Sequence, residues 1–285
     1  MLKFDTITDL NNHLEKLRKD GFKIGFIPTM GALHRGHLSL IERAKQDKVI
    51  TVCSIFVNPT QFTNANDLKN YPRTMDADSS LLDGANCDIL FAPSVEEIYP
   101  HPSKTFYNFG FLETPMEGIH RKGHFNGMAT VVNRLFEIVK PDFAYFGEKD
   151  FQQLTIVKML VKMQALPIKI IPCETLREKG GLAMSSRNIH LSSKEKEEAL
   201  IISQTLFKVK ELLPTTPFDE LRYWAINNLT KNPNIQLEYF EIADAETLKP
   251  IKDGITNPDQ LNSKIRAFIA LKIGQTRLID NLELN

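Results

Sequence analysis

The chain has 285 residues, enough for one large domain or two smaller ones with a substantial core. Its 35 basic residues (Lys and Arg) balance 35 acidic ones, which argues against bulk nucleic-acid binding because that needs a basic excess. The hydrophobic share of 42% is that of an ordinary soluble globular protein. We recognise neither a signal-peptide core nor an uncharged membrane span, and expect no membrane partner.

The cysteines are three in number, which is odd, and each lies in or beside an apolar run: Cys53, Cys87 and Cys173. No two of them are spaced as metal ligands or as a redox pair. We therefore expect buried free thiols in a reducing compartment, and predict a cytoplasmic protein.

Apolar runs of strand length alternate with helix-period segments through the first 175 residues. The predicted strands are Ile24–Ile27, Val49–Val57, Ile89–Phe91, Phe143–Phe146 and Ile168–Ile171. The predicted helices between them are Leu38–Lys45, Ser79–Gly84, Met128–Val139 and Leu154–Met163. This alternation predicts an α/β fold, a Rossmann-like parallel sheet with helices on both faces.

The pattern changes after Pro172. A small-residue loop, 180–188, precedes a long charged helix near 193–213 whose Ser-Ser-Lys-Glu start resembles a capping box. A helix near 221–229 and strand-like runs follow at 235–243, 266–273 and 276–279. Consecutive strands without helices between them predict a smaller C-terminal α+β lobe. We place the two domains at residues 1–175 and 176–285.

The segment Pro28-Thr29-Met30-Gly31-Ala32-Leu33-His34-Arg35-Gly36-His37 follows the first predicted strand and opens a helix. Backbone N–H groups at a helix N-terminus attract phosphate, and glycines allow a ligand to approach the backbone. His34 and His37, three residues apart, can face the same anion. Such turns also occur without ligands, with a histidine serving as a cap. The lead-in on a buried strand favours a site that holds and cleaves nucleotide phosphates.

Two further polar clusters follow predicted strands. Asn58-Pro59-Thr60-Gln61-Phe62 comes after the second strand, and Gly147-Glu148-Lys149-Asp150 comes before a helix that begins with Gln152 and Gln153. The carboxyl ends of parallel strands share one rim, so these clusters are expected to converge with the first. Taken alone, Lys149 could equally belong to a solvated charge cluster, and Ser185-Ser186-Arg187 to a turn that binds nothing.

Two segments leave their alternatives open. His120-Arg121-Lys122-Gly123-His124-Phe125-Asn126-Gly127 either covers an anionic ligand or forms a surface loop. Asp76 and Asp78, which follow Tyr71-Pro72-Arg73-Thr74, either orient a metal-bound phosphate or serve as acids in the first turn of a helix. The second alternative is the simpler one for both aspartates.

These residues together resemble a known family. The matching segments are 28–37 and Tyr71–Thr74 as written above, Ser54-Ile55-Phe56-Val57-Asn58-Pro59-Thr60-Gln61-Phe62, Phe146-Gly147-Glu148-Lys149-Asp150-Phe151-Gln152-Gln153, Gly181-Leu182-Ala183-Met184-Ser185-Ser186-Arg187-Asn188 and Arg277-Leu278-Ile279-Asp280-Asn281. Over essentially its full length the chain is similar to the pantothenate synthetase (pantoate–β-alanine ligase) family. The wider superfamily of HIGH-type nucleotidyl transferases shares only the H-x-G-H element and a later KMSKS-like loop.

The resemblance implies a two-step ligation. ATP and pantoate would give pantoyl adenylate and pyrophosphate, and β-alanine would then give pantothenate and AMP, with Mg²⁺ accompanying ATP. It also implies a homodimer and a C-terminal lobe that acts as a lid carrying the KMSKS-like loop. The rival hypotheses are an adenylyltransferase of the same superfamily that acts on another small acid or phosphate, and a nucleotide-binding scaffold without activity.

The family pattern assigns roles residue by residue. Its ATP-site positions are Met30, Gly31, Ala32, Leu33, His34, Arg35, Gly36, His37, Gly147, Glu148, Lys149, Asp150, Leu176, Met184, Ser185, Ser186 and Arg187. Its catalytic positions are His34, His37, Lys149, Ser185, Ser186 and Arg187, with His37 as the assigned proton donor. Pantoate and β-alanine would be held by Gln61, Gln153 and Asn58. No residue is a dedicated metal ligand, although Asp78 is a candidate.

Two positions depart from the family pattern. Gly180 stands where an acidic residue is common, and Leu176 stands where valine is usual. We expect the first change to alter the mobility of the loop that follows, and the second to be a mild change in an apolar contact.

Overall fold

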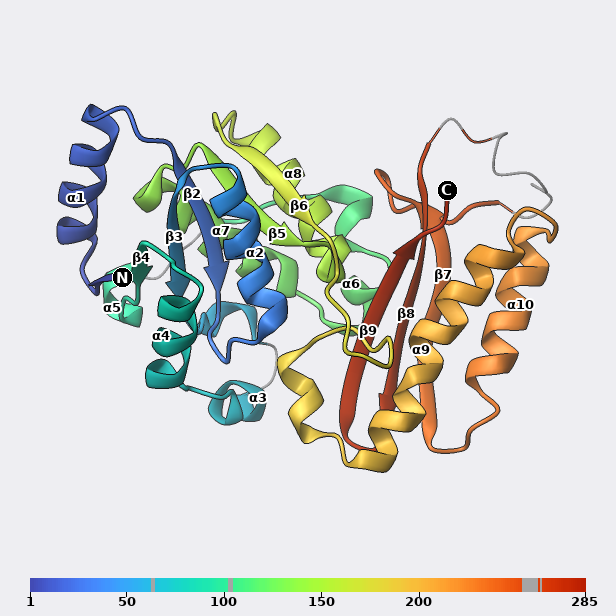
Figure 1. Ribbon diagram of the computed structural model, residues 1–285. Coiled ribbons are helices and arrows are strands. Elements are labelled where there is room, and N and C mark those ends of the chain that lie inside the picture. Colours follow the sequence, from blue (N-terminus) through green and yellow to red (C-terminus); the bar gives the residue numbers. More distant parts are fainter. Residues whose placement is uncertain (63–64, 102–104, 253–260, 262) are drawn as a thin grey trace. The chain divides into compact units, whose positions relative to one another are not determined.

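The chain folds into two compact units (Figure 1), and the computed structural model describes residues 1–62, 65–101, 105–252, 261 and 263–285. The first unit comprises Met1–Glu113, Glu117–Glu148 and Gln153–Glu174. The second comprises Thr114–Met116, Lys149–Gln152 and Thr175–Asn285. Two short segments from the first 175 residues therefore pack with the C-terminal part of the chain.

The first unit contains a six-stranded sheet in the order β1-β4-β3-β2-β5-β6, and every strand pair in it is parallel. The strands are β1 (Leu2–Phe4), β2 (Ile24–Thr29), β3 (Ile50–Ile55), β4 (Ile89–Phe91), β5 (Phe143–Gly147) and β6 (Lys169–Cys173). This confirms the predicted parallel sheet.

Helices cover both faces of this sheet because successive side chains of a strand point to opposite sides. Phe26 of β2 meets Phe136 of α7 edge to face, with ring centroids 6.3 Å apart. Its neighbour Ile27 belongs to a different cluster, together with Ile41 of α2 and Leu82 of α4. The helices that connect its strands along the chain are α1 (Ile7–Lys19), α2 (Arg35–Gln46), α3 (Ala65–Asn70), α4 (Met75–Gly84), α5 (Val95–Ile98), α6 (Glu117–His120), α7 (His124–Val139) and α8 (Phe151–Met163), with 3-10 turns η1 (Pro59–Gln61), η2 (Gly110–Glu113) and η3 (Glu148–Asp150). Of η3 and α8, the residues Lys149–Gln152 belong to the second unit.

The strand order reverses at β2. From β2 the chain moves outward through β3 and β4 on one side, and β5 and β6 lie on the other side. In doubly wound sheets, ligands bind beyond the carboxyl ends of the strands at such a reversal. The turn after β2 and the Gly147–Glu148 step from β5 into η3 both follow the carboxyl ends of these two parallel strands.

The second unit is built on a three-stranded antiparallel sheet, β7-β8-β9, as predicted for an α+β lobe. Its elements are η4 (Ser186–His190), α9 (Ser193–Leu212), α10 (Phe218–Leu229), β7 (Ile235–Asp244), β8 (Ile265–Ile273) and β9 (Thr276–Glu283). Its buried core joins Leu206 of α9, Leu221 of α10 and Ile269 of β8. The capping box expected before α9 is present: Ser192 accepts from the N–H of Glu195, whose carboxylate accepts from the N–H of Ser192.

The sequence analysis missed the first two elements. Strand β1 has only three residues, of which the first two are exposed, so it shows no apolar run. Helix α1 is mostly polar, and its buried contacts rest on Leu10 and Leu14. A helix with so few apolar residues packs through one narrow stripe, which a search for apolar runs does not detect.

Cys53, Cys87 and Cys173 are buried free thiols, which confirms the expectation for them. Burial raises the pKa of the Cys173 thiol to about 12, so the thiol stays protonated and unreactive. Within the described ranges of the chain, we find no helix that combines the length and the apolar character needed to cross a membrane.

Candidate active site

The turn between β2 and α2 reverses the chain through two successive residues in the left-handed region, Gly31 (φ 82°) and Ala32 (φ 49°). A side chain at Gly31 would start 3.0 Å from the Asp78 carboxylate and 3.1 Å from Ile55, on top of an already unfavourable φ. The predicted glycine therefore meets both a conformational and a spatial requirement.

Asp78, which is 2% exposed on α4, holds this turn from behind. Its two carboxylate oxygens accept the N–H groups of Ala32 (2.9 Å) and Leu33 (2.7 Å), and the Thr74 hydroxyl lies 3.1 Å away. These contacts do not fit a ligand of a divalent cation. Among the described residues, no group of three or more His, Cys, Asp or Glu side chains could hold a metal ion.

His34 and His37 cap helix α2 as well as facing each other. The Nδ1 atom of His34, the N-cap residue, accepts the N–H of Gly36 at 3.1 Å, and the N–H of His34 donates to Nδ1 of His37 at 3.3 Å. The ring centroids lie 4.0 Å apart. Because Nδ1 accepts in both rings, each neutral imidazole carries its proton on Nε2 and can donate from there.

This arrangement changes the expectation that backbone N–H groups of the turn bind phosphate. The N–H of Gly31 donates to the Thr29 hydroxyl, those of Ala32 and Leu33 donate to Asp78, and those of His34 and Gly36 donate to imidazole nitrogens. These donors hold the turn itself in shape. The imidazole Nε2–H groups are therefore the better candidates for binding an anion.

Asn58 and Gln61, at the end of β3, are buried together beside the turn. The Asn58 amide donates to Gln61 Oε1 (3.2 Å) and to the Gly127 carbonyl (3.1 Å), and its oxygen accepts the Tyr99 hydroxyl (3.0 Å). Gln61 in turn directs its amide nitrogen at the Met30 sulfur. Both N–H groups of the Asn58 amide thus have protein partners, which indicates that it orients Gln61 instead of touching a ligand itself.

The start of helix α7 supports Gln61 from the other side. Nδ1 of His124, a residue that is 5% exposed, lies 2.9 Å from the backbone oxygen of Gln61. A side chain at Gly127 would start only 2.2 Å from the Thr60 carbonyl oxygen, so the helix packs directly on η1. Of the two alternatives for segment 120–127, neither describes its end: His124 and Gly127 are buried parts of the support for Gln61.

In the second unit, Lys149 shares a small hollow with the Gly181–Asn188 loop. Ser185, Arg187 and Asp280 are among the residues that line it with Lys149. The Ser185 hydroxyl caps η4 by accepting the N–H of Arg187 at 3.3 Å. The Met184 N–H donates to the Leu176 carbonyl at 2.9 Å, so two residues expected at the ATP site are paired through their backbones.

The other predicted residues are placed as follows. Arg35 is exposed at the start of α2, and Asp150 is exposed with its carboxylate 3.8 Å from Lys149 Nζ. Ser186 begins η4. In the first unit, Gly147 ends β5, Glu148 begins η3, and Gln153 is partly buried on α8.

The model of the Pantoate-beta-alanine ligase family matches residues 3–283 of the chain. The chain belongs to this family. A curated pantothenate synthetase from Azobacteroides pseudotrichonymphae is 49% identical over 97% of this chain and 98% of its own length, and one from Bacteroides fragilis is 47% identical over 98% and 97%. The crystal structure of pantothenate synthetase from Thermus thermophilus superposes with a TM-score of 0.91 at 39% identity, covering 100% of this chain and 99% of the other.

A second solved structure of the family is the pantoate-beta-alanine ligase from Francisella tularensis complexed with beta-gamma ATP and beta-alanine. It is 37% identical to this chain, with a TM-score of 0.78, and the match covers 99% of this chain and 97% of the other.

The departure from the pantoate–β-alanine ligase pattern at Gly180 has a local packing context. A β-carbon at this position would lie 3.0 Å from a methyl group of Leu200 on α9. The next residue, Gly181, has φ 100° and sits against Ser203 of the same helix. The loop therefore lies close against α9, and the position has room for glycine but little for an acidic side chain.

Proposed function

We propose that this site joins pantoate to β-alanine in two steps through an acyl adenylate. As a member of the family, the chain is an ATP-dependent pantoate–β-alanine ligase. In the first step a carboxylate oxygen of pantoate attacks the α-phosphorus of ATP, the bond to the bridging oxygen breaks, and pyrophosphate leaves. In the second, the β-alanine amine attacks the activated carbonyl, loses a proton, and AMP leaves. Adenylation makes the carboxylate a good acylating group.

The first unit would supply two different kinds of donor. The Nε2–H groups of His34 and His37 suit the charge that develops on the phosphate oxygens as pyrophosphate leaves. The Gln61 amide suits the hydroxyl and carboxylate groups of pantoate, because it offers donors and an acceptor without net charge. Gln153 is proposed as a second amide for pantoate.

The second unit would supply positive charge. We assign Lys149 and Arg187 to the phosphates, with the Ser185 and Ser186 hydroxyls as additional donors. Leu176 is assigned to the adenosine, and Met184 belongs to the loop assigned to the phosphates. Mg²⁺ would come with ATP and take its ligands from phosphate oxygens and water, since Asp78 is engaged in holding the turn.

The observation that carries the proposal is the contact between Gln61 and Met30. It places a neutral amide, suited to a small polyhydroxy acid, directly against the turn that carries the two histidines. An adenylyltransferase that acts on a phosphate has no need of such a group beside its phosphate site. The contact therefore favours activation of a small acid, and the experiment below tests the amide formation that follows.

The deciding experiment supplies the protein with ATP, Mg²⁺, pantoate and β-alanine and measures AMP and pantothenate. Both products are expected in equal amounts, and each should require all three substrates for sustained turnover. AMP release that ignores β-alanine and gives no amide would contradict the ligase assignment and favour the adenylyltransferase.

Two variants test the assigned phosphate residues. Lys149→Ala and His37→Ala are each expected to lower the rate at least about a hundredfold, the scale of removing one group that stabilises transition-state charge. Lys158→Ala, an exposed lysine on α8, and His190→Ala, an exposed histidine at the end of η4, are the matched controls and should retain the wild-type rate. Circular dichroism checks that each variant folds.

Two properties of the whole protein complete the proposal. We propose a homodimer, the form implied by the resemblance to the family, and a cytoplasmic location, which suits three buried free thiols. Sedimentation velocity would measure the first, and fractionation of the source cells the second.

A further inference from the structure

The segment Arg277–Asn281 carries part of the family resemblance but has no part in the proposed chemistry. It lies on β9, where Asp280 pairs with Ile269 and Asn281 with Phe268 of β8. Both Asp280 and Asn281 are only 3% exposed. Burying two neighbouring polar side chains is unfavourable unless each is hydrogen-bonded, so their partners indicate what they do.

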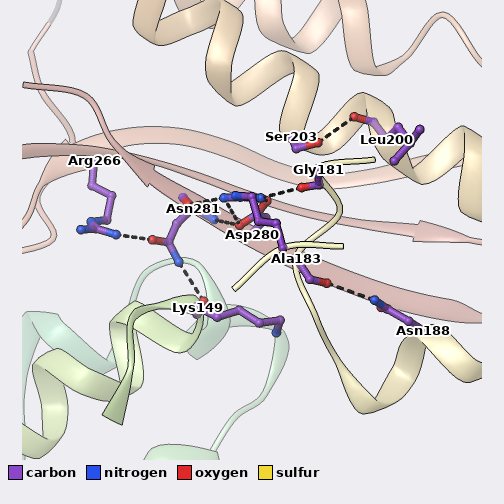
Figure 2. Close-up of polar contacts among 10 residues, drawn as sticks. Lys149, Gly181, Ala183, Asn188, Leu200, Ser203, Arg266, Asp280 and Asn281 are labelled. Carbon is purple, nitrogen blue, oxygen red and sulfur yellow. Dashed lines mark hydrogen bonds and ion pairs between the residues drawn. The ribbon is translucent and has the colours of Figure 1, made fainter. Parts of the chain in front are cut away.

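Asn281 links a buried arginine to the backbone of Lys149 (Figure 2). Its side-chain oxygen accepts from Nη1 of Arg266 at 2.6 Å, and its amide nitrogen donates to the Lys149 carbonyl at 2.8 Å. A guanidinium only donates, so the Asn281 oxygen must face Arg266 and its NH₂ group must face Lys149. The arginine thus fixes which way the amide points.

Arg266 also holds the same segment directly. Its guanidinium carbon lies 3.9 Å from the centroid of the Phe151 ring, and Phe151 packs on Phe268 with centroids 6.0 Å apart. Lys149–Gln152 belongs to the second unit, in agreement with these contacts. Two attachments, one at Lys149 and one at Phe151, therefore fix the backbone from which the Lys149 side chain extends.

Asp280 holds the neighbouring Gly181–Asn188 loop through Arg177, as Asn281 holds the backbone of Lys149. It binds the Arg177 guanidinium through both oxygens, at 2.5 and 3.1 Å, and Arg177 Nη1 donates to the Gly181 carbonyl at 3.0 Å. Further along the loop, Asn188 donates to the Ala183 carbonyl at 3.0 Å. Asp280 and Asn281 thus attach Lys149 and the Gly181–Asn188 loop to one strand.

We propose that Asn281, oriented by Arg266, is a positioning residue that sets Lys149 for ATP, with its neighbour Asp280 setting the Gly181–Asn188 loop through Arg177. The inference rests on the proposed function, because it takes Lys149 to bind the phosphates of ATP. Asn281 acts through the lysine and does not touch the nucleotide.

The test is a double-mutant cycle between Asn281 and Lys149, read out as binding of a non-hydrolysable ATP analogue by calorimetry. Asn281→Asp keeps the shape and the bond to Arg266 but turns an oxygen toward the Lys149 carbonyl. It is expected to weaken binding about fivefold to tenfold, the range that one net hydrogen bond supplies. In a Lys149→Ala background the same change should have little further effect.

Two further variants keep the test decisive. Asn281→Ala removes the hydrogen bonds without adding charge, and should show the same dependence on Lys149 if the aspartate variant folds poorly. Asn285→Ala is the matched control: Asn285 also ties strand ends, donating to the Ser263 carbonyl and accepting the Ile265 N–H, and its loss should leave ATP binding unchanged.

Wild-type binding by Asn281→Asp and Asn281→Ala would overturn the proposal. The proposal would also be overturned if the Asn281 variants weakened ATP-analogue binding by the same factor in the Lys149→Ala background as in the wild type, because Asn281 would then act independently of the lysine. Failure of the proposed function is a separate result: it would appear in the wild-type assay as absence of pantothenate, while the binding cycle still reports on Lys149 and the nucleotide.

Discussion

The regions of the two units that are assigned to ATP are held by groups of opposite hydrogen-bonding character, an acceptor in the first unit and donors in the second. In the first unit, the Asp78 carboxylate accepts the N–H groups of Ala32 and Leu33. In the second, the Arg177 guanidinium and the Asn281 amide donate to the carbonyls of Gly181 and Lys149. In the first unit a side-chain carboxylate accepts backbone N–H groups. In the second unit side-chain N–H groups donate to backbone carbonyls.

The difference shows which groups each loop leaves for a polyanion. In the turn after β2 the N–H groups of Ala32, Leu33, His34 and Gly36 donate within the protein, so we assign the phosphate contact to the imidazoles of His34 and His37. In the second unit the groups that Arg177 and Asn281 engage are carbonyl oxygens, which would repel phosphate if they faced it. Holding a loop by its carbonyls therefore also suits anion binding.

The largest expected effect comes from removing the cation of the second loop. Arg177→Met leaves the Asp280 carboxylate buried and unpaired, which should lower the free energy of unfolding by about 3–5 kcal/mol. Burial already raises the pKa of Asp280 above its ordinary 3.8 despite the opposing effect of Arg177, and the variant should raise it further.

This prediction has a defined pH dependence. A carboxyl group with a raised pKa in the folded state is destabilising when ionised, so the cost of Arg177→Met should be largest near neutral pH. It should shrink as the pH falls toward the ordinary value of 3.8. Urea denaturation at several pH values measures it, and Asp280→Asn added to the variant should recover part of the loss. A cost independent of pH would contradict it.

Removing the anion of the first loop should have the next largest effect. Asp78→Ala leaves two buried N–H groups without their acceptor and is expected to lower the free energy of unfolding by about 2–4 kcal/mol. ATP-analogue binding should weaken with it, because the turn loses its support. Asp76→Ala, at an exposed position on the same helix, is the control for urea denaturation and calorimetry. Equal free energies of unfolding for the two variants would show that the turn keeps its conformation without the Asp78 carboxylate.

A smaller effect is expected where α7 packs on η1. Gly127→Ala would place a methyl group 2.2 Å from the Thr60 carbonyl oxygen, so the helix must shift and carry His124 away from Gln61. We expect a loss of about 1–3 kcal/mol, typical of overpacking, and a raised KM for pantoate with a nearly unchanged KM for ATP. Gly84→Ala, where the added carbon meets nothing within 4 Å, is the control. A parallel rise in both KM values would contradict the local explanation.

The smallest effects distinguish two adjacent glycines in the second loop. Gly181→Ala should cost about 1–3 kcal/mol because φ is 100° there. Gly180→Ala should cost less, since its φ is not positive and the added carbon meets only the two methyl groups of the Leu200 side chain, at 3.0 and 3.4 Å. Thermal unfolding of the pair measures the contrast, and equal costs would mean that the backbone conformation is not what requires glycine.

Much of the fold followed from the sequence because its signals are local. The strand predicted at Ile24–Ile27 lies within β2, and Pro28–His37 contains in one run the glycine and both histidines of the turn. Apolar runs and helix periodicity locate elements without knowledge of their partners. The parallel sheet and the strands of the C-terminal α+β lobe were predictable for this reason.

The supports of the site were not predictable, because they join residues far apart in the chain. Asp78 is 46 residues from Ala32, and Asn281 is 132 residues from Lys149. Asn58 shows a different limit: its residue type suits a ligand contact, but its neighbours in the fold use both of its N–H groups. Only the folded chain shows which polar groups already have partners.

The assignment of Lys149–Gln152 to the second unit limits where recombination can divide the gene. Lys149–Gln152 lies within the first 175 residues but packs with the second unit, through Asn281, Arg266 and Phe268. A gene split or fused between residues 175 and 176 would separate Lys149 from the strands that hold it. Exchange of one unit between relatives would therefore have to carry matching partners for this short segment. Recombination at that point should be selected against even though it interrupts no helix or strand.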